Sequence, residues 1–277
     1  MLGWTILSHT FPYTPHTGCY TVEPTDDLLS VYRRLRRGQQ TPVRLTVPSV
    51  RRLSRLAGTL ANSLMLDSAE VATAFADSAF AAAQGYNTAS LPSLFIPNTY
   101  EVYWDTSLER LMQRLKREHD AFWQAEGRDE AARELGMTRE EVATLASIID
   151  EETNYGPERA RIAGLYINRL HRGMPLQADP TVKFALGNDS LRRILNSHLR
   201  TPSPYNTYLN TGLPPGPIRI ATIASIDAVL NAEKHDYLYF CAREDFSGSH
   251  NFARTYAEHM ANARRYQQAL NARGIRK

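Results

Sequence analysis

Apolar residues in the first third of the chain follow two spacings, one typical of strands and one typical of helices. Alternating apolar positions predict short strands at 20–22 and 43–47. Apolar positions three and four residues apart predict helices at about 26–38, 50–64 and 68–83, the first of which ends at a glycine. Together these elements indicate a small α+β unit.

The spacing changes near Leu94, where the aromatic segment PNTYEVYW leads into a long amphipathic helix expected at about 107–123. We place a domain boundary here. Helical spacing then predicts helices that start at Thr138, after Pro157 and near Thr255, while YLYFCA predicts a buried strand. The pattern as a whole predicts an α+β fold. Its parts are an irregular segment, a small α+β unit and a mixed, helix-rich domain, at 1–19, 20–92 and 93–277.

The composition restricts the class of protein. The chain has 277 residues, 43% of them apolar and 22% charged, so it is long enough to bury a sizeable core. Its net charge of +3 is far from the concentrated Lys/Arg stripe of a nucleic-acid-binding protein. No stretch of the sequence reaches the roughly 20 apolar residues of a membrane-spanning helix, and we expect this chain to be soluble. Cys19 and Cys241 are too few for a disulfide scaffold, and we expect two free thiols.

The helix TREEVATLASIIDEET carries the candidate chemistry, and a Thr and a Glu three residues apart form a capping box at its start. At 100° per residue, Glu152 falls beside Leu145 and Ile148 at the edge of the buried stripe. Glu151 falls roughly opposite and should face solvent, so replacing it by Gln should do little. An apolar edge raises the pKa of a carboxylic acid, as a general acid working near neutral pH requires. Among the three acids that end this helix, Glu152 is the best-placed catalytic acid.

Two polar segments that follow this helix could line a site. In MPLQADPTVKFALG, Gln177, Asp179 and Thr181 alternate, so an extended chain would present all three to one side. The prolines of SPYNTYLNTGLPPGPI stiffen that segment, and Tyr205 and Tyr208 offer flat surfaces on which sugar rings pack. An ordinary polar loop and a rigid surface connection would have the same composition.

Seven motifs occur in this order: LASIIDEET, AGLYINRL, GMPLQADPTV, SPYNTY, GLPPGPI, YLYF and HNFARTYAEH. These motifs and their order resemble those of the YceG-like family of endolytic murein transglycosylases. The resemblance is close over about residues 93–277. In that family the catalytic glutamate immediately precedes a threonine. The glutamate at that place in this sequence is Glu152. The first glutamate of the family's Glu-x-Glu-Thr pattern is replaced here by Asp150.

The resemblance implies a lytic transglycosylase that cleaves the MurNAc–GlcNAc bond of peptidoglycan and leaves 1,6-anhydro-MurNAc ends, terminating nascent glycan strands. Glu152 would protonate the glycosidic oxygen and then accept the proton of the MurNAc C6 hydroxyl. Such a reaction needs no metal and no cofactor. The residues expected to bind the substrate are Gln177, Asp179, Thr181, Tyr205, Asn206, Thr207 and Tyr208.

The resemblance also implies the surroundings of the enzyme. The pattern Tyr-x-Val-x-x-x-Asp-x-Leu at 20–28 is similar to the start of LysM glycan-binding modules, so 20–92 is expected to be LysM-like. Glycan strands are the expected partner, and peptidoglycan synthases are further candidates. Family members are anchored by an N-terminal helix at the periplasmic face of the inner membrane. This sequence contains no such helix, and we expect that location for a full-length form.

Two other classes of function stay open. A hydrolase would use Glu152 together with Asp179, the latter to position water. A non-catalytic scaffold of the cell wall would bind glycan through the LysM-like unit. A zinc amidase is disfavoured, because the histidines lack the H-E-x-x-H spacing of zinc sites. These histidines are His171, His198, His235, His250 and His259.

Overall fold

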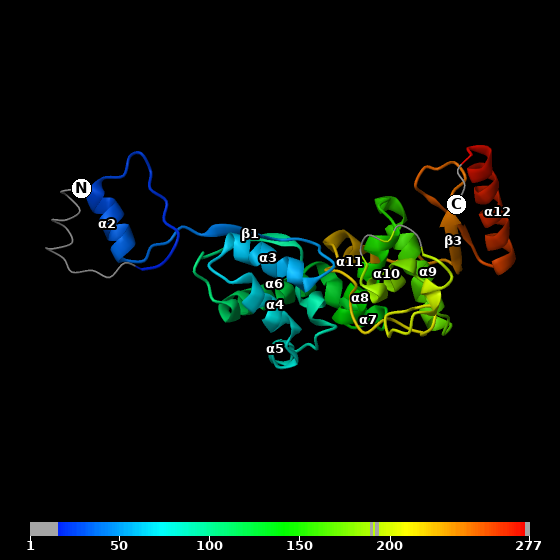
Figure 1. Cartoon of the computed structure of the whole chain (residues 1–277), viewed down its shortest axis with the longest axis horizontal. Coiled ribbons are helices and arrows are strands. Elements are labelled where there is room, and N and C mark those ends of the chain that lie inside the picture. The colour runs from blue at the N-terminus through cyan, green and yellow to red at the C-terminus, as the bar shows by residue number, and fades with distance from the viewer. Residues whose placement is uncertain (1–15, 189–190, 192–193, 275–277) are drawn as a thin grey trace.

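The structure, a computed structural model, describes residues 16–188, 191 and 194–274. Figure 1 shows an elongated molecule with α2 (Leu28–Arg36) at one end and α12 (Tyr256–Ala272) at the other. Helices dominate the described residues, and their strands form two antiparallel pairs, which confirms the α+β prediction. None of the described helices is both long enough and apolar enough to cross a membrane. Residues 1–15 of the predicted irregular segment lie outside the described residues.

The first helix, α2, lies within the predicted range of about 26–38 and is shorter by two residues at each end. It begins after Asp27, whose carboxylate accepts a hydrogen bond of 2.6 Å from the backbone N–H of Ser30. It ends just before Gly38, which has a positive φ of 60°. The predicted strand at 20–22 is wrong, because these largely exposed residues pair with no other described strand.

A first hydrophobic core lies between a two-stranded sheet and the helices that follow it. β1 (Val43–Val47) pairs antiparallel with β2 (Asn98–Val102), and Leu45 and Val47 point into the core, as the alternation predicts. The covering elements are α3 (Leu53–Ser63), α4 (Ser68–Ala76), α5 (Ser78–Gln84), the 3₁₀ turn η1 (Leu91–Leu94) and α6 (Leu108–Gln124).

The single helix predicted at 68–83 is in fact two helices, α4 and α5. Asp77 separates them because its backbone is extended, with φ −80° and ψ 126°. Its carboxylate then caps α5 by accepting a 2.9 Å hydrogen bond from the N–H of Ala79. An aspartate inside an apolar helical pattern here marks the start of a new helix.

A second core surrounds α8 (Arg139–Glu152), in which every residue from Val142 to Asp150 is buried. The predicted capping box is confirmed, because Thr138 and Glu141 each accept a hydrogen bond from the other's backbone N–H. The neighbouring elements are η2 (Ala125–Gly127), α7 (Arg128–Glu134), η3 (Gly156–Glu158), α9 (Arg159–His171), α10 (Asp179–Leu186), η4 (His198–Arg200) and α11 (Ile223–Leu230).

The C-terminal part is a hairpin covered by a helix, at the end of the molecule opposite α2 (Figure 1). β3 (Tyr239–Ala242) pairs antiparallel with β4 (His250–Ala253), and α12 packs on them. The strand predicted from YLYFCA is confirmed. It is half-buried rather than buried, because a two-stranded sheet leaves every strand at an edge.

The two cores meet within α6. Its residues Leu111 and Leu115 belong to the first core, whereas Trp123 belongs to the second. β2, which follows the predicted boundary at residue 93, pairs with β1, which precedes it. We therefore propose that the boundary between the two units lies within α6.

Candidate active site

Glu152 is the last residue of α8, and its side chain lies where the helix stops. Thr153 has an extended backbone with φ −144°, so the chain leaves the helix axis immediately after Glu152. The phenol of Tyr166, on α9, donates a 2.8 Å hydrogen bond to Glu152 Oε1. Glu152 is half-buried and lines two cavities, one of 320 Å³ and one of 560 Å³.

Burial raises the pKa of Glu152 to about 7, from its ordinary 4.5. The hydrogen bond from Tyr166 acts in the opposite direction, since it stabilises the carboxylate, and the negative charge of Asp179 raises the pKa further. Burial also raises the pKa of Tyr166 well above its ordinary value, so the phenol keeps its proton. At neutral pH Glu152 is thus able both to donate and to accept a proton.

The smaller cavity, which we call the loop cavity, contains three of the predicted binding residues. Asp179 is exposed there and accepts a 2.6 Å hydrogen bond from the hydroxyl of Tyr208. Gln177 has a positive φ of 53°, a conformation that is uncommon for residues other than glycine. Its N–H donates to the carbonyl oxygen of Thr207 at 3.0 Å. The cavity is lined by Glu152, Tyr166, Arg169, Leu176, Gln177, Asp179, Tyr208, Tyr239, Phe240, Tyr256 and His259.

The extended alternation expected at 177–181 is wrong, because α10 begins at Asp179 with a proline in its first turn. Thr181 consequently points into the protein, and its hydroxyl lies 2.9 Å from that of Thr207. Asn206 is also buried and donates to the carbonyl oxygens of two residues of its own loop. Thr181, Asn206 and Thr207 thus hold the polar loop in place and do not line either cavity of Glu152.

Tyr205 lies away from Glu152. Its ring packs on Phe184 with 4.7 Å between the ring centroids, and it lines a third cavity, which Glu152 does not reach. Of the two tyrosines singled out from the sequence, the structure brings Tyr208 to the candidate acid and places Tyr205 elsewhere.

The larger cavity, which we call the hairpin cavity, was not predicted from the sequence. His250, on β4, lines it, and its Nδ1 lies 2.9 Å from a carboxylate oxygen of the buried Glu158. The backbone N–H of His250 also donates to both oxygens of that carboxylate, at 3.1 Å each. The cavity is lined by Glu152, Thr153, Asn154, Tyr155, Ala242, Arg243, Phe246, Ser247, Gly248, Ser249, His250 and Tyr266.

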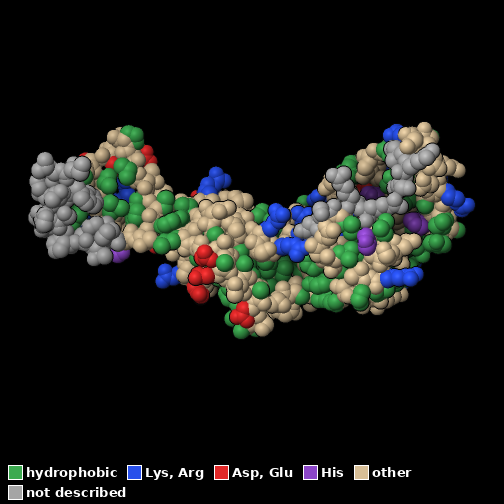
Figure 2. All heavy atoms as spheres, in the orientation of Figure 1, with side chains coloured by type: hydrophobic (Ala, Val, Ile, Leu, Met, Phe, Trp, Pro, Cys, Tyr) green, Lys and Arg blue, Asp and Glu red, His purple; other side chains and the backbone are tan. Residues whose placement is uncertain are grey.

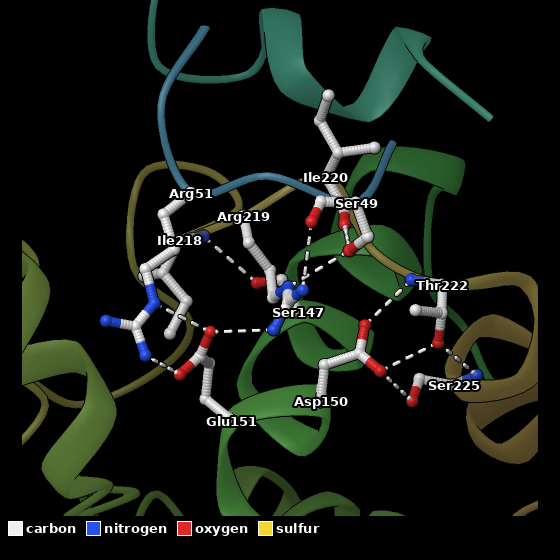
Figure 3. Close-up of polar contacts among 10 residues, drawn as sticks. All are labelled: Ser49, Arg51, Ser147, Asp150, Glu151, Ile218, Arg219, Ile220, Thr222 and Ser225. Carbon is white, nitrogen blue, oxygen red and sulfur yellow. Dashed lines mark hydrogen bonds and ion pairs between the residues drawn. The ribbon is translucent and has the colours of Figure 1, made fainter. Parts of the chain in front are cut away.

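Asp150 and Glu151, the acids before Glu152, both bind side chains or backbone groups of other segments (Figure 3). Asp150, 8% exposed, accepts hydrogen bonds from the backbone N–H and hydroxyl of Thr222, each 2.7 Å long, and from the hydroxyl of Ser225 at 2.6 Å. It therefore fixes the start of α11. The expectation that Glu151 faces solvent is wrong, because its side chain is 10% exposed and binds Arg51 and Arg219.

Sequence reasoning missed Tyr166 and Arg169, the two polar side chains that α9 contributes to the loop cavity. The signal for Tyr166 was its place in the apolar stripe of AGLYINRL, since a buried tyrosine hydroxyl usually has a partner. Arg169 is buried, and its guanidinium group donates hydrogen bonds to the carbonyl oxygens of Leu238 (2.7 Å) and Leu176 (2.8 Å). No local pattern indicates those two contacts.

The described residues offer no cluster of three or more His, Cys, Asp or Glu side chains suited to a metal ion. Cys19 and Cys241 are free thiols. The arrangement around Glu152 consists of hydroxyl, amide, carboxylate, guanidinium and aromatic groups. Such groups bind sugars through hydrogen bonds and stacking.

The family model and the named relatives that match this sequence agree with one another. The sequence model of the YceG-like family matches residues 6–265. The endolytic murein transglycosylase of Bacillus subtilis is 37% identical over 167 residues, 60% of this chain and 45% of that protein. The enzyme of that name from Streptococcus pneumoniae is 32% identical over 156 residues, 55% of this chain and 28% of that protein. The matches thus span less than half the length of these relatives.

A solved structure is similar as well. The crystal structure of a YceG-like protein from Listeria monocytogenes superposes with a TM-score of 0.66 at 30% sequence identity. The superposition covers 87% of this chain and 83% of that one, so the similarity includes both cores and not the candidate active site alone.

Proposed function

The chain belongs to the YceG-like family, and from this premise we propose that it is an endolytic murein transglycosylase, which cuts peptidoglycan glycan strands without consuming water. One observation carries the proposal. Glu152 is a single carboxylic acid with a pKa of about 7 that lines two cavities at once. A glycan strand that occupies both cavities has a glycosidic bond beside this carboxyl group.

The mechanism needs one carboxyl group in two protonation states. Protonated Glu152 donates its proton to the glycosidic oxygen between MurNAc and GlcNAc, and the bond between this oxygen and C1 of MurNAc breaks. The resulting carboxylate accepts the proton of the MurNAc C6 hydroxyl, whose oxygen bonds to C1 and closes the 1,6-anhydro ring. The proton balance returns Glu152 to its starting state. Tyr166 supports the cycle, since its hydrogen bond favours the carboxylate that forms midway.

The remaining polar groups are assigned by the cavity that they line. Gln177, Asp179 and Tyr208 contact the sugar in the loop cavity. His250 contacts it in the hairpin cavity through Nε2, because Glu158 occupies Nδ1. Thr181, Tyr205, Asn206 and Thr207, also expected to bind the substrate, act instead through the loop and helix that carry these groups.

The wider role follows from the product. An anhydro end has no free C1 hydroxyl, so cleavage ends a glycan strand, and peptidoglycan synthases are the expected partners. Residues 20–92, whose sheet and core are completed by β2 and the first part of α6, are proposed to act as a LysM-like module. The module would contact the glycan strand at the periplasmic face of the inner membrane. Binding of unlabelled glycan strands by an inactive Glu152→Gln protein, with and without substitutions of exposed residues in 20–92, tests the module's part.

The products test the proposal directly. Intact glycan strands incubated with the protein should yield muropeptides with 1,6-anhydro ends when analysed by mass spectrometry. Reducing ends would identify a hydrolase that uses Glu152 and Asp179. The absence of any product would identify a non-catalytic glycan-binding scaffold.

The dependence of rate on pH should follow Glu152. The carboxyl must be protonated when the bond breaks, so kcat/KM should fall about tenfold per pH unit above a pKa of about 7. Tyr166→Phe removes a hydrogen bond that lowers this pKa, so its alkaline limb should move to higher pH. Rates measured from about pH 5 to 9 check both. A flat profile would exclude Glu152 as a general acid with a raised pKa.

Asp179→Asn should retain activity within about tenfold and give anhydro products alone, because the amide oxygen still accepts the hydrogen bond of Tyr208. Its alkaline limb should move to lower pH, since a negative charge that raises the pKa of Glu152 is lost. If Asp179 instead activated water, the same substitution would cost about a hundredfold or more in rate. Rates and product masses measured on one digest distinguish these cases.

A further inference from the structure

Glu151 joins three segments that are far apart in the sequence, as Figure 3 shows. Arg51 donates from Nε to Glu151 Oε1 at 2.9 Å and from a second nitrogen to Oε2, so the pair is bidentate. Arg219 donates to Oε1 at 2.8 Å. We call Glu151, Arg51 and Arg219 the Glu151 clamp. Arg51 follows β1 of the first core, Glu151 is the next-to-last residue of α8, and Arg219 precedes α11.

The clamp is part of a continuous polar contact between the two units. Arg219 also donates to the hydroxyl of Ser49 at 3.0 Å and to its carbonyl oxygen at 3.1 Å. The N–H of Ile220 donates to the carbonyl oxygen of Val50 at 2.9 Å, and that of Ile218 to the hydroxyl of Ser147 at 3.0 Å. Hydrogen bonds thus connect the segment 218–220 to the residues that follow β1 on one side and to α8 on the other.

Helix stability alone does not explain a glutamate at this position. A negative charge in the last turn of a helix opposes the helix dipole, and a carboxylate that is 10% exposed needs partners to offset its lost hydration. Two arginines supply them here. The contact fixes the last turn of α8 from two directions, one residue before Glu152.

We propose that Glu151 is a positioning residue, which holds Glu152 in place by binding Arg51 of the first core and Arg219. The inference rests on the proposed catalytic role of Glu152. In this role the unit that contains the first core contributes to the active site, because its Arg51 fixes the last turn of α8.

The charge of the clamp also acts on Glu152. With one carboxylate and two guanidinium groups its net charge is +1, which becomes +2 in Glu151→Gln, 0 in Arg51→Met and +1 again in the double variant. A more positive neighbour favours the ionised form of Glu152 and lowers its pKa. The other titratable or charged groups around Glu152 are Tyr155, Tyr166, Arg169, Asp179, Lys183, Tyr208, Tyr239, Arg243, His250, Tyr256, His259 and Tyr266.

The test compares these three variants with Arg139→Met, a matched control at the other end of α8. Arg139 bonds Asp129 (2.6 Å) and Asp120 (2.9 Å) and does not line either cavity. Glu151→Gln and Arg51→Met should each lower kcat about tenfold with KM within about twofold, since positioning affects the reacting geometry more than binding. The control should keep its kcat.

The alkaline limb separates positioning beside Glu152 from general loss of stability. The limb should move to lower pH by about half a unit in Glu151→Gln and to higher pH by a similar amount in Arg51→Met. In the double variant it should lie where it lies in the unmodified protein. A carboxyl ¹³C NMR titration of Glu152 reports the same shifts without activity. If Glu151→Gln does not fold, Arg219→Met replaces it, with an upward shift expected.

Unchanged kcat in the clamp variants, or shifts of the same sign in Glu151→Gln and Arg51→Met, would overturn the inference. Failure of the proposed function is distinct, because the unmodified protein would then release no anhydro products. The NMR titration would still show whether the clamp acts on Glu152.

Discussion

Replacing Glu152 by Gln is expected to lower the rate of glycan-strand cleavage by about a thousandfold or more. The amide has nearly the same shape, and its oxygen can still accept the hydrogen bond from Tyr166. It cannot donate a proton to the glycosidic oxygen and recover one from the C6 hydroxyl. The release of soluble muropeptides from glycan strands, followed over time, measures the loss.

The fold of this variant should be intact. The pKa of Glu152 in the folded protein is above its ordinary value, so ionisation between about pH 4.5 and 7 destabilises the folded state. A neutral amide avoids this cost, and the melting temperature of the variant at pH 8 should be no lower than that of the unmodified protein. Glu134→Gln, an exposed change on α7, is the control and should keep full activity. Activity in Glu152→Gln would contradict the assignment.

Asp150→Ala is expected to lower the free energy of unfolding by about 3 kcal/mol. The carboxylate accepts hydrogen bonds from the backbone N–H and hydroxyl of Thr222 and from the hydroxyl of Ser225. Alanine leaves these buried or partly buried donors without their acceptor, and α11 loses the group that fixes its start. Urea unfolding followed by circular dichroism measures the change.

The control for this loss is Asp236→Ala, which removes an exposed aspartate and should change the free energy of unfolding by less than about 0.5 kcal/mol. Equal stability of the two variants would show that Asp150 is not a structural acceptor. A loss of stability confined to Asp150→Ala would show that this carboxylate joins α8 to the start of α11.

The sequence predicts well what a single helix or strand determines. The capping box of Thr138 and Glu141 marks the start of α8, and the apolar phase places Glu152 at the edge of the core. These features depend on residues within one turn or one repeat of each other. For the same reason β1 and β3 were found from their own alternation and apolar runs.

The errors concern contacts between distant segments. A helical phase places Glu151 opposite the apolar stripe, but only the folded chain brings Arg51 and Arg219, 100 and 68 residues away, to that face. The expected strand at 20–22 had suitable residues and lacked a partner. The alternation of Gln177, Asp179 and Thr181 was overridden by a helix that begins at Asp179.

The most direct test of the central claim is the origin of the new chain end. Glycan strands are digested in water enriched in heavy oxygen, and the new MurNAc ends are analysed by mass spectrometry. Intramolecular attack by the C6 hydroxyl predicts 1,6-anhydro ends that carry no label, because no water enters the product. Label at the new MurNAc terminus would contradict transglycosylation and identify hydrolysis.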